Sequence, residues 1–295
     1  MKISEILAKK NVTLSLEVFP PKKQDAFAGV VATAKELTEL HPDFMSITYG
    51  ANGSTRENTA EIASEIEKCG TTALAHLTCI GANADGIDNA IARLKKFNIE
   101  NVLALRGDVP SDMTKEDAVG KFPHASDIVP LLKEAGLCVG GACYPEGHPE
   151  SSSRIEDIDN LKKKVDAGVD FLTTQMFFDN DMLYSFLYQL QNKGIHVPVI
   201  AGIMPITSAQ QVQRMVKLSD AYIPRKLLAI CDRFSDNSDA MRQAGIAYAI
   251  DQIIDLISNG VRGIHIYTMN KSSVSRDILS NINAIISAVN SPRLS

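Results

Sequence analysis

The chain contains 295 residues, of which 45% are hydrophobic and 22% are charged, and its formal net charge is -5. This composition is typical of a globular protein large enough for one barrel or two ordinary domains. The small negative charge offers no general attraction to nucleic acid or to an anionic membrane, and no apolar run approaches the ~20 residues that span a bilayer.

Strand-like and helix-like segments alternate along the chain, and most of the strand-like runs are continuously apolar, as expected for parallel strands buried on both faces. Strands are predicted over residues 12–19, 44–48, 72–79, 101–106, 137–143, 170–176, 197–202 and 261–267. Helices are predicted over 26–40, 59–69, 85–97, 127–135, 155–167, 180–192, 208–217, 224–231, 239–258 and 273–288, with turns at 50–54 and a polar loop over 108–125. This alternation predicts an α/β fold, a single (β/α)8 TIM barrel over 1–295 with an extra helical segment at about 203–240.

Polar residues stand where the apolar runs end. The ends of five predicted strands carry Glu17, Thr48, His76, Arg106 and Gln175. Because parallel barrel strands all end at one rim, we expect these side chains to surround one active site.

Glu17 follows Leu16 and precedes Val18 and Phe19. Such apolar neighbours desolvate a carboxyl group, so we expect a raised pKa suited to a general acid. The alternative is an ordinary strand-end carboxylate paired with Lys or Arg.

Arg106, Gly107 and Asp108 form a second candidate group. Gly107 permits close approach of a ligand to the backbone, Arg106 offers a fork for phosphate or carboxylate, and Asp108 can accept N–H groups of a heterocycle. A solvated turn with a local ion pair is the alternative.

Tyr144 and His148 lie in a loop that follows the small-residue strand 139–143. That strand is expected to leave space for something flat, on which Tyr144 can stack. For His148 the alternative is a hydrogen-bonded loop histidine.

Asp157, Asn160 and Lys164 share one face of a predicted helix, where Lys164 can meet phosphates or a ring oxygen. The alternative is a solvated face with a local ion pair.

The remaining signals are mostly negative. His76 reads more readily as a core histidine than as a ligand, and no H-x-H or H-E-x-x-H spacing supports a metal site. Five cysteines without a C-x-x-C pair indicate reduced thiols and a cytoplasmic setting. Neither a G-x-G-x-x-G nor a G-x-x-x-x-G-K-[ST] motif is present, and no basic stripe indicates nucleic-acid binding.

Taken together, these segments resemble the methylenetetrahydrofolate reductase family, flavin-dependent barrel enzymes of one-carbon metabolism and methionine biosynthesis. The matching stretches occur in the family's order over almost the whole chain: 16–21, 46–52, 76–79, 104–108, 142–150, 160–168 and 174–179. The matching stretches end with the barrel, so the resemblance leads us to expect the bacterial type, without the C-terminal regulatory region of eukaryotic members.

The resemblance implies a bound FAD, which passes a hydride from NADH or NADPH to 5,10-methylenetetrahydrofolate in a ping-pong reaction. It implies that Glu17 is the general acid. It also implies that Asp108 lies near the flavin and pterin rings, where its charge tunes the flavin potential and stabilises the cationic folate. Substrate-binding positions are Gln175, Tyr267, Lys271 and Thr48. Cofactor-binding positions are Thr48, His76, Arg106, Gly107, Asp108, Ala125, Tyr144, His148, Asp157, Asn160 and Lys164. A homo-oligomer is expected, with no resident metal and no nucleic-acid or membrane partner.

Three positions depart from the family pattern. Ala209 stands where an aromatic residue stacks on the nicotinamide, Lys271 where an Arg meets the folate tail, and His124 where a Tyr contacts FAD. Ala209 leaves room for another electron donor, so a flavin- or folate-binding subunit that needs a partner remains an alternative. A metal-dependent barrel lyase is a second alternative.

Overall fold

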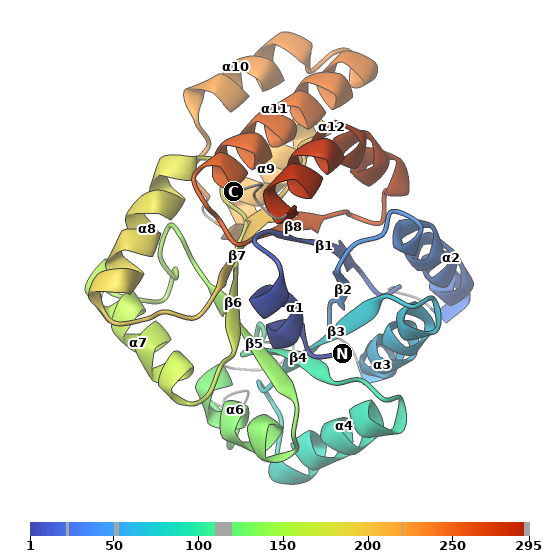
Figure 1. Ribbon diagram of the computed structural model, residues 1–295, viewed down its shortest axis with the longest axis vertical. Helices are drawn as coiled ribbons and strands as arrows, with labels where there is room; N and C mark the ends of the chain where they lie inside the picture. The colour runs from blue at the N-terminus through green and yellow to red at the C-terminus, as the bar shows by residue number, and fades with distance from the viewer. Residues whose placement is uncertain (22–23, 50–52, 110–119, 220, 292–295) are drawn as a thin grey trace.

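The computed structural model describes residues 1–21, 24–49, 53–109, 120–219 and 221–291. Within these residues, parallel strands β1 to β8 pair in chain order, and β8 pairs with β1 to close a barrel (Figure 1). The predicted (β/α)8 barrel is therefore confirmed. The strands are β1 (Thr13–Val18), β2 (Phe44–Ile47), β3 (Thr72–Thr78), β4 (Asn101–Leu105), β5 (Cys138–Cys143), β6 (Phe171–Thr174), β7 (Val199–Ile203) and β8 (Gly263–Tyr267).

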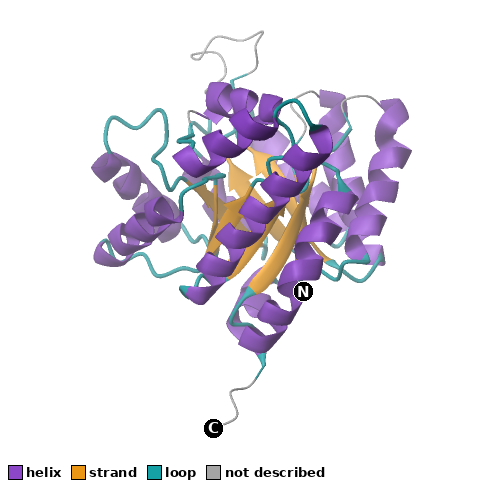
Figure 2. Cartoon of the chain, turned by 90° about the horizontal axis from the view of Figure 1, so that it is seen from above, coloured by secondary structure: helices purple, strands orange, loops and turns teal. Residues whose placement is uncertain are grey.

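Helices surround the barrel (Figure 2). They are α1 (Ile3–Lys9), α2 (Phe27–Thr38), α3 (Gly53–Lys68), α4 (Ala84–Lys96), α6 (Ala125–Glu134), α7 (Arg154–Asp166), α8 (Asn180–Asn192), α9 (Ala209–Ser219), α10 (Arg225–Phe234), α11 (Ser238–Ser258) and α12 (Ser272–Asn290). A short 3-10 turn spans Gln24–Ala26. The largest apolar cluster lies between the strands and these helices, and it buries Leu14, Leu16 and Val18 of β1.

β1 and β8 depart from the continuous apolar pattern. On β1, Thr13, Ser15 and Glu17 alternate with apolar residues, and Ser15 lies beside His265 in the register of the two strands. The polar members of this alternation face the barrel interior, where Ser15 and Glu17 both contact His265. These polar side chains are therefore buried inside the closed barrel. A strand that is apolar on both faces would place no polar side chain there.

The N-terminal helix α1 covers one end of the barrel, at the centre of the view in Figure 1. Ile3 and Leu7 pack inside the barrel against Phe44, Phe171 and their neighbours. Asn101 at the start of β4 holds the helix by accepting the Ile3 N–H (2.8 Å) and donating to the Met1 carbonyl (3.0 Å). This end of the barrel is apolar and closed, so the polar residues gather toward the opposite end.

The start of α3 differs from the sequence-based expectation. α3 begins at Gly53, six residues before the predicted start, because the Gly-Ser pair that suggests a turn also suits the first turn of a helix. Residues 50–52 of the predicted turn, and 110–119 of the predicted polar loop, lie outside the described residues.

Between β7 and β8 the chain adds α9 and α10 before α11. These helices enclose a second apolar cluster that includes Met176, Met204, Met215 and Met241. The extra helical segment expected at about 203–240 corresponds to α9 and α10.

Candidate active site

The carboxyl ends of the strands bring most of the candidate residues to one mouth of the barrel. Each parallel strand runs toward this mouth, so residues at or just after strand ends collect there. The residues placed in this way are Glu17, Thr48, His76, Arg106, Gly107, Asp108, Tyr144, Gln175 and Tyr267.

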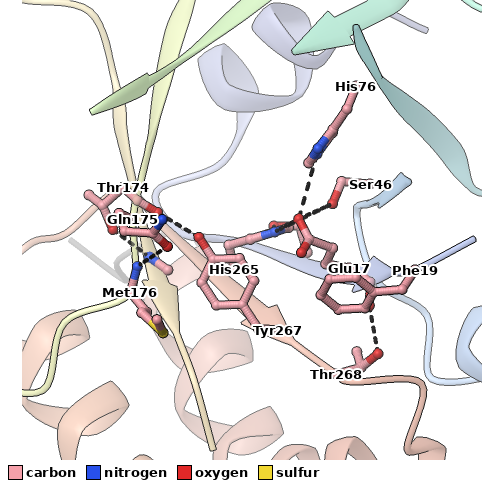
Figure 3. A network of polar contacts seen from close by, with 12 residues as sticks. Glu17, Phe19, Ser46, His76, Thr174, Gln175, Met176, His265, Tyr267 and Thr268 are labelled. Atoms are coloured by element: carbon pink, nitrogen blue, oxygen red, sulfur yellow. Dashed lines mark hydrogen bonds and ion pairs between the residues drawn. The ribbon is translucent and has the colours of Figure 1, made fainter. Parts of the chain in front are cut away.

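Glu17 lies at the centre of a buried polar cluster (Figure 3). Glu17 is only 4% exposed to solvent. The Ser46 hydroxyl donates to Glu17 Oε2 (3.2 Å), while His265 Nε2 and His76 Nε2 lie 3.4 and 3.5 Å from the same oxygen. Neither Lys nor Arg pairs with this carboxyl in the contacts of the described residues, so the ordinary ion-pair reading of Glu17 does not apply.

The pKa of Glu17 reflects two opposing influences. Burial raises it. The hydrogen bond to His265, the charges of His76 and His265, and the Ser46 hydroxyl lower it, and together they outweigh the effect of burial. The pKa of Glu17 therefore lies below its ordinary value, and the raised pKa expected from the apolar neighbours is wrong. The expectation included the apolar residues next to Glu17 in the sequence but not the histidines that other strands bring to it.

His76 is buried on β3, and burial lowers its pKa to about 4 despite the nearby Glu17 charge. Its ring is therefore neutral at pH 7. No hydrogen bond satisfies His76 Nε2, although this atom is inaccessible to water. An unsatisfied nitrogen of this kind can hydrogen-bond to a polar group of a ligand that enters the mouth.

Arg106 leads a second group, on the loops after β4 and β5. Its guanidinium pairs with Glu150, and this hydrogen bond raises its pKa. Tyr144 packs edge-on against His148 with ring centroids 4.6 Å apart, and His148 Nδ1 accepts the Glu150 N–H (3.1 Å). Burial raises the pKa of Tyr144 to about 12 and lowers that of His148, so both rings are uncharged at pH 7.

Gly107 has a backbone conformation that favours glycine, with φ of +85°. A Cβ atom there would meet the side chains of Ile80 and Thr78, each at 2.9 Å. The chain can therefore turn tightly after β4 only with glycine at this position. Asp108 follows on the exposed side of the turn.

Helix α7 contributes Asp157 and Lys164 toward β5. Asp157 is buried, which raises its pKa, and its carboxylate accepts from the Ser151 hydroxyl (3.4 Å). Lys164 Nζ donates to the Ala142 carbonyl of β5 (2.8 Å), and burial lowers its pKa. Asn160, predicted on the same face, is exposed and accepts a hydrogen bond from Lys163 (3.0 Å).

The strand β5 does not leave the empty space that its small residues suggest. A Cβ atom on Gly140 would lie 2.5 Å from the Phe171 ring, and one on Gly141 would lie 3.1 Å from the Lys164 stem. The expectation that this strand makes room for a flat ligand is therefore wrong, because Phe171 and Lys164 already fill the space beside these glycines.

Tyr267 closes the opposite side of the mouth. Its hydroxyl donates to the Thr174 carbonyl (2.7 Å), and its ring packs edge-on against His265 at 5.2 Å. The Thr174 hydroxyl accepts the Gly202 N–H (2.8 Å), which ties β6 to β7 beside it. Gln175 comes next on this strand end, half-buried, and its side-chain oxygen accepts the Met176 N–H (3.0 Å).

The remaining predicted residues lie around the rim. Thr48 donates its N–H to the Val18 carbonyl (3.1 Å), and Ala125 is the buried first residue of α6, just after His124. Lys271 Nζ donates to the Thr207 hydroxyl (3.1 Å) before α12 begins. Ala209 is the first residue of α9 and packs against the methionine-rich cluster.

The mouth offers several groups to a bound cofactor. Besides His76 Nε2, the Thr173 hydroxyl is buried without a hydrogen-bond partner. Two unsatisfied polar atoms on β3 and β6, together with the Arg106 guanidinium, fit a large ligand that carries both ring heteroatoms and phosphate. In the part of the chain that the structure describes, no group of three His, Cys, Asp or Glu side chains is arranged to hold a metal ion.

Sequence reasoning missed His265, Ser46 and Glu150. His265 follows the same alternation as Tyr267 on β8, so a period-two pattern of Gly263, His265 and Tyr267 is the signal that could have found it. Nothing in the sequence pairs Glu150 with Arg106, because the two residues belong to different loops.

A family model described as methylenetetrahydrofolate reductase matches residues 2–283. The chain is 34% identical over 275 residues to 5,10-methylenetetrahydrofolate reductase of Escherichia coli (strain K12), covering 92% of this chain and 90% of that protein. It is 35% identical over 301 residues to methylenetetrahydrofolate reductase (NADH) 1 of Arabidopsis thaliana, covering 96% of this chain. The chain spans about half the length of the plant relatives that it matches (50%).

Among solved structures, an uncharacterized protein from Clostridium thermocellum that binds two copies of 5-methyl-5,6,7,8-tetrahydrofolic acid aligns with a TM-score of 0.65. The alignment covers 98% of this chain and 100% of that chain at 15% identity. Dihydropteroate synthase from Xanthomonas albilineans aligns with a TM-score of 0.54 at 15% identity, covering 95% and 94% of the two chains. At such identities these structures support the barrel fold alone.

Proposed function

The chain belongs to the methylenetetrahydrofolate reductase family, and on this basis we propose that it reduces 5,10-methylenetetrahydrofolate to 5-methyltetrahydrofolate with FAD as its cofactor. The observation that carries the proposal is the buried carboxyl of Glu17 at the barrel mouth, in contact with His265, His76 and Ser46. A reduction that opens a nitrogen-containing ring needs a proton delivered out of contact with water, and Glu17 with its histidine neighbours is in position to relay one.

Bound FAD would supply the hydride acceptor and donor that connects a nicotinamide nucleotide with the folate. The residues that would hold it are those of the mouth and of α7. His76 and Thr173 offer unsatisfied polar atoms, and Arg106 offers charge for a phosphate. Lys164 and Asp157 extend the polar surface from α7 toward β5.

The chain's own residues would act on the folate as follows. Glu17 donates a proton to the ring nitrogen that leaves the methylene carbon, which favours the reactive open form. Asp108 places a negative charge on the turn after β4, where it would stabilise a cationic folate. Gln175 and Tyr267 border the same mouth and would orient the pterin, and Lys271 would supply a positive charge for the folate's acidic tail.

The donor we propose is NADH, which the names of the plant relatives specify. Ala209 supports a second candidate, in which a partner protein delivers the electrons. The side chain at this position is a methyl group at the start of α9, so it offers no ring on which a nicotinamide can stack. A cytoplasmic setting fits the five cysteines, which form no disulfide.

An absorbance spectrum followed by anaerobic titration tests these proposals together. We expect purified protein to show a flavin spectrum that bleaches with NADH and recovers on addition of 5,10-methylenetetrahydrofolate. A flavin that ignores both NADH and NADPH, yet oxidises 5-methyltetrahydrofolate with an artificial acceptor, would favour the partner-dependent candidate. A colourless protein that cannot be loaded with FAD would refute both candidates.

A further inference from the structure

His265 lies between two side chains of β1, inside the barrel. Its Nδ1 is 2.8 Å from the Ser15 hydroxyl oxygen, and its Nε2 is 3.4 Å from Glu17 Oε2. The Ser46 hydroxyl oxygen also lies 3.4 Å from Nε2, and its hydrogen is donated to Glu17 Oε2. His265 is only 2% exposed, so both ring nitrogens depend on these protein partners. The register of β1 and β8, which pairs Ser15 with His265, fixes this arrangement.

Ser15 determines which ring nitrogen carries the hydrogen. Its hydroxyl donates to the Ile264 carbonyl (3.2 Å), so its oxygen is left to accept a hydrogen bond from His265 Nδ1–H. A neutral ring then has its lone pair at Nε2, directed at Glu17 Oε2. A lone pair facing a carboxylate in a buried site is unfavourable, whereas one proton between the two atoms satisfies both.

We propose that Glu17 and His265 hold one proton in common between Oε2 and Nε2, and that this pair is the store from which Glu17 protonates the folate. The inference deepens the proposed function and rests on it. His265 is thus a positioning residue that acts through Glu17.

The other titratable groups that face the pair do not compete for this proton. His76 approaches from β3, but burial lowers its pKa to about 4, so its ring is neutral at pH 7. Tyr267 lies beside His265 on β8, and its hydroxyl hydrogen is directed to the Thr174 carbonyl. Burial raises the pKa of Tyr267 well above its usual value, so it remains a neutral phenol.

The transfer moves one proton and no electrons. The Nε2–H bond of His265 breaks as the Oε2–H bond of Glu17 forms. That O–H bond then breaks as the proton binds the folate nitrogen. A neutral His265 and a Glu17 carboxylate remain, and water that refills the mouth after product release returns the proton.

The pH dependence of the folate step tests this inference with His265→Gln. A pair that shares one proton titrates as a unit, so its apparent pKa belongs to the pair and not to either residue. Gln at position 265 cannot hold the proton, so Glu17 is left as its only site in the pair. We therefore expect the alkaline limb of the folate step to move to lower pH by at least about 0.3 pH unit, the statistical contribution of the second site.

The matched control is His196→Gln, an exposed residue before β7. We expect it to retain the wild-type pH profile. If His265→Gln lowers the rate equally at every pH and leaves the limb unmoved, His265 has only a structural role and the inference is wrong.

A second readout does not depend on turnover. In protein labelled with ¹⁵N-histidine and loaded with FAD, we expect the His265 signal, identified by its loss in His265→Gln, to show hydrogen on Nδ1 at all pH values. In Ser15→Ala we expect the neutral ring to carry its hydrogen on Nε2 instead. A wild-type ring with hydrogen on Nε2 alone would overturn the shared proton.

The two proposals fail in different ways. If the wild-type protein does not reduce the folate, the proposed function and the folate step of this inference are both refuted, while the ring nitrogens still report on the pair. If the protein turns over and the ring nitrogens show no shared proton, the inference alone is refuted.

Discussion

Replacing Glu17 with Gln tests the proton donor directly. The substitution keeps the size of the side chain, and the Gln amide nitrogen, in the place of Oε2, can donate to His265 Nε2 and to the Ser46 hydroxyl oxygen. We therefore expect a stability loss of about 1 kcal/mol or less, which corresponds to a Tm decrease of a few degrees. The amide cannot release a proton, so the folate step loses its general acid.

The size of the kinetic effect follows from that loss. General acid catalysis contributes typically ~10²- to 10⁴-fold, or about 3–5 kcal/mol of barrier. We expect the folate step to slow by this factor, while NADH still bleaches the flavin at a rate within about threefold of wild type, because that step needs no proton from Glu17. Anaerobic stopped-flow absorbance measures the two steps separately in the same sample.

Glu134→Gln is the matched control, since it makes the same chemical change at an exposed residue at the end of α6. We expect wild-type rates for both of its steps. Wild-type folate reduction by Glu17→Gln would refute the acid role. Equal loss of both steps would show that the substitution disrupts the site as a whole, and the reasoning would fail in that case too.

Three further predictions concern charge, packing and pH. Asp108→Asn removes a negative charge from the mouth, and we expect the flavin midpoint potential to rise by roughly 20 mV in a redox titration; an unchanged potential would contradict the charge argument. Gly202→Ala would place a Cβ atom 2.7 Å from the Tyr267 hydroxyl, so we expect a loss of about 1–3 kcal/mol in denaturant unfolding. Gly29→Ala, a helix position with nothing within 4 Å, should instead stabilise the protein by ~0.5–1 kcal/mol, and the same sign for both would be inconsistent with the packing argument. Because the pKa of His76 falls from 6.5 to about 4 on folding, its contribution to stability is complete above pH 6.5 and is lost as the pH falls toward 4. Between pH 7 and pH 5 we expect the apoprotein to lose about 2 kcal/mol of unfolding free energy, and His76→Asn to lose less; an equal loss in both would exclude His76 as the cause.

Much of the barrel was predictable from the chain, because continuous apolar runs and turn residues mark where strands begin and end. The position of Glu17 at the mouth followed from the same pattern, since it stands where the first run meets Val18 and Phe19. These are local signals, and they survive in the folded protein because each βα unit is built from neighbouring residues.

The residues that surround Glu17 could not be predicted from such local signals. Ser15 and His265 are 250 positions apart and meet only because the last strand pairs with the first. The lowering of the Glu17 pKa depends on that closure, so its neighbours in the sequence predicted a shift in the wrong direction. The glycines of β5 misled for a related reason, because the Phe171 ring that fills their space comes from the next strand.

Helix α1 covers the end of the barrel opposite the mouth, and the end of α12 is held close to the start of β1. Asn290 at the end of α12 accepts the Asn11 N–H (2.9 Å) and donates to the Val12 carbonyl (2.8 Å), at the start of β1. Both ends of the described chain therefore lie on the side away from the mouth, as Figure 2 shows. A fluorescent reporter or a surface tether attached at either end would leave the entrance unobstructed, which makes the protein suitable for immobilised single-molecule measurements.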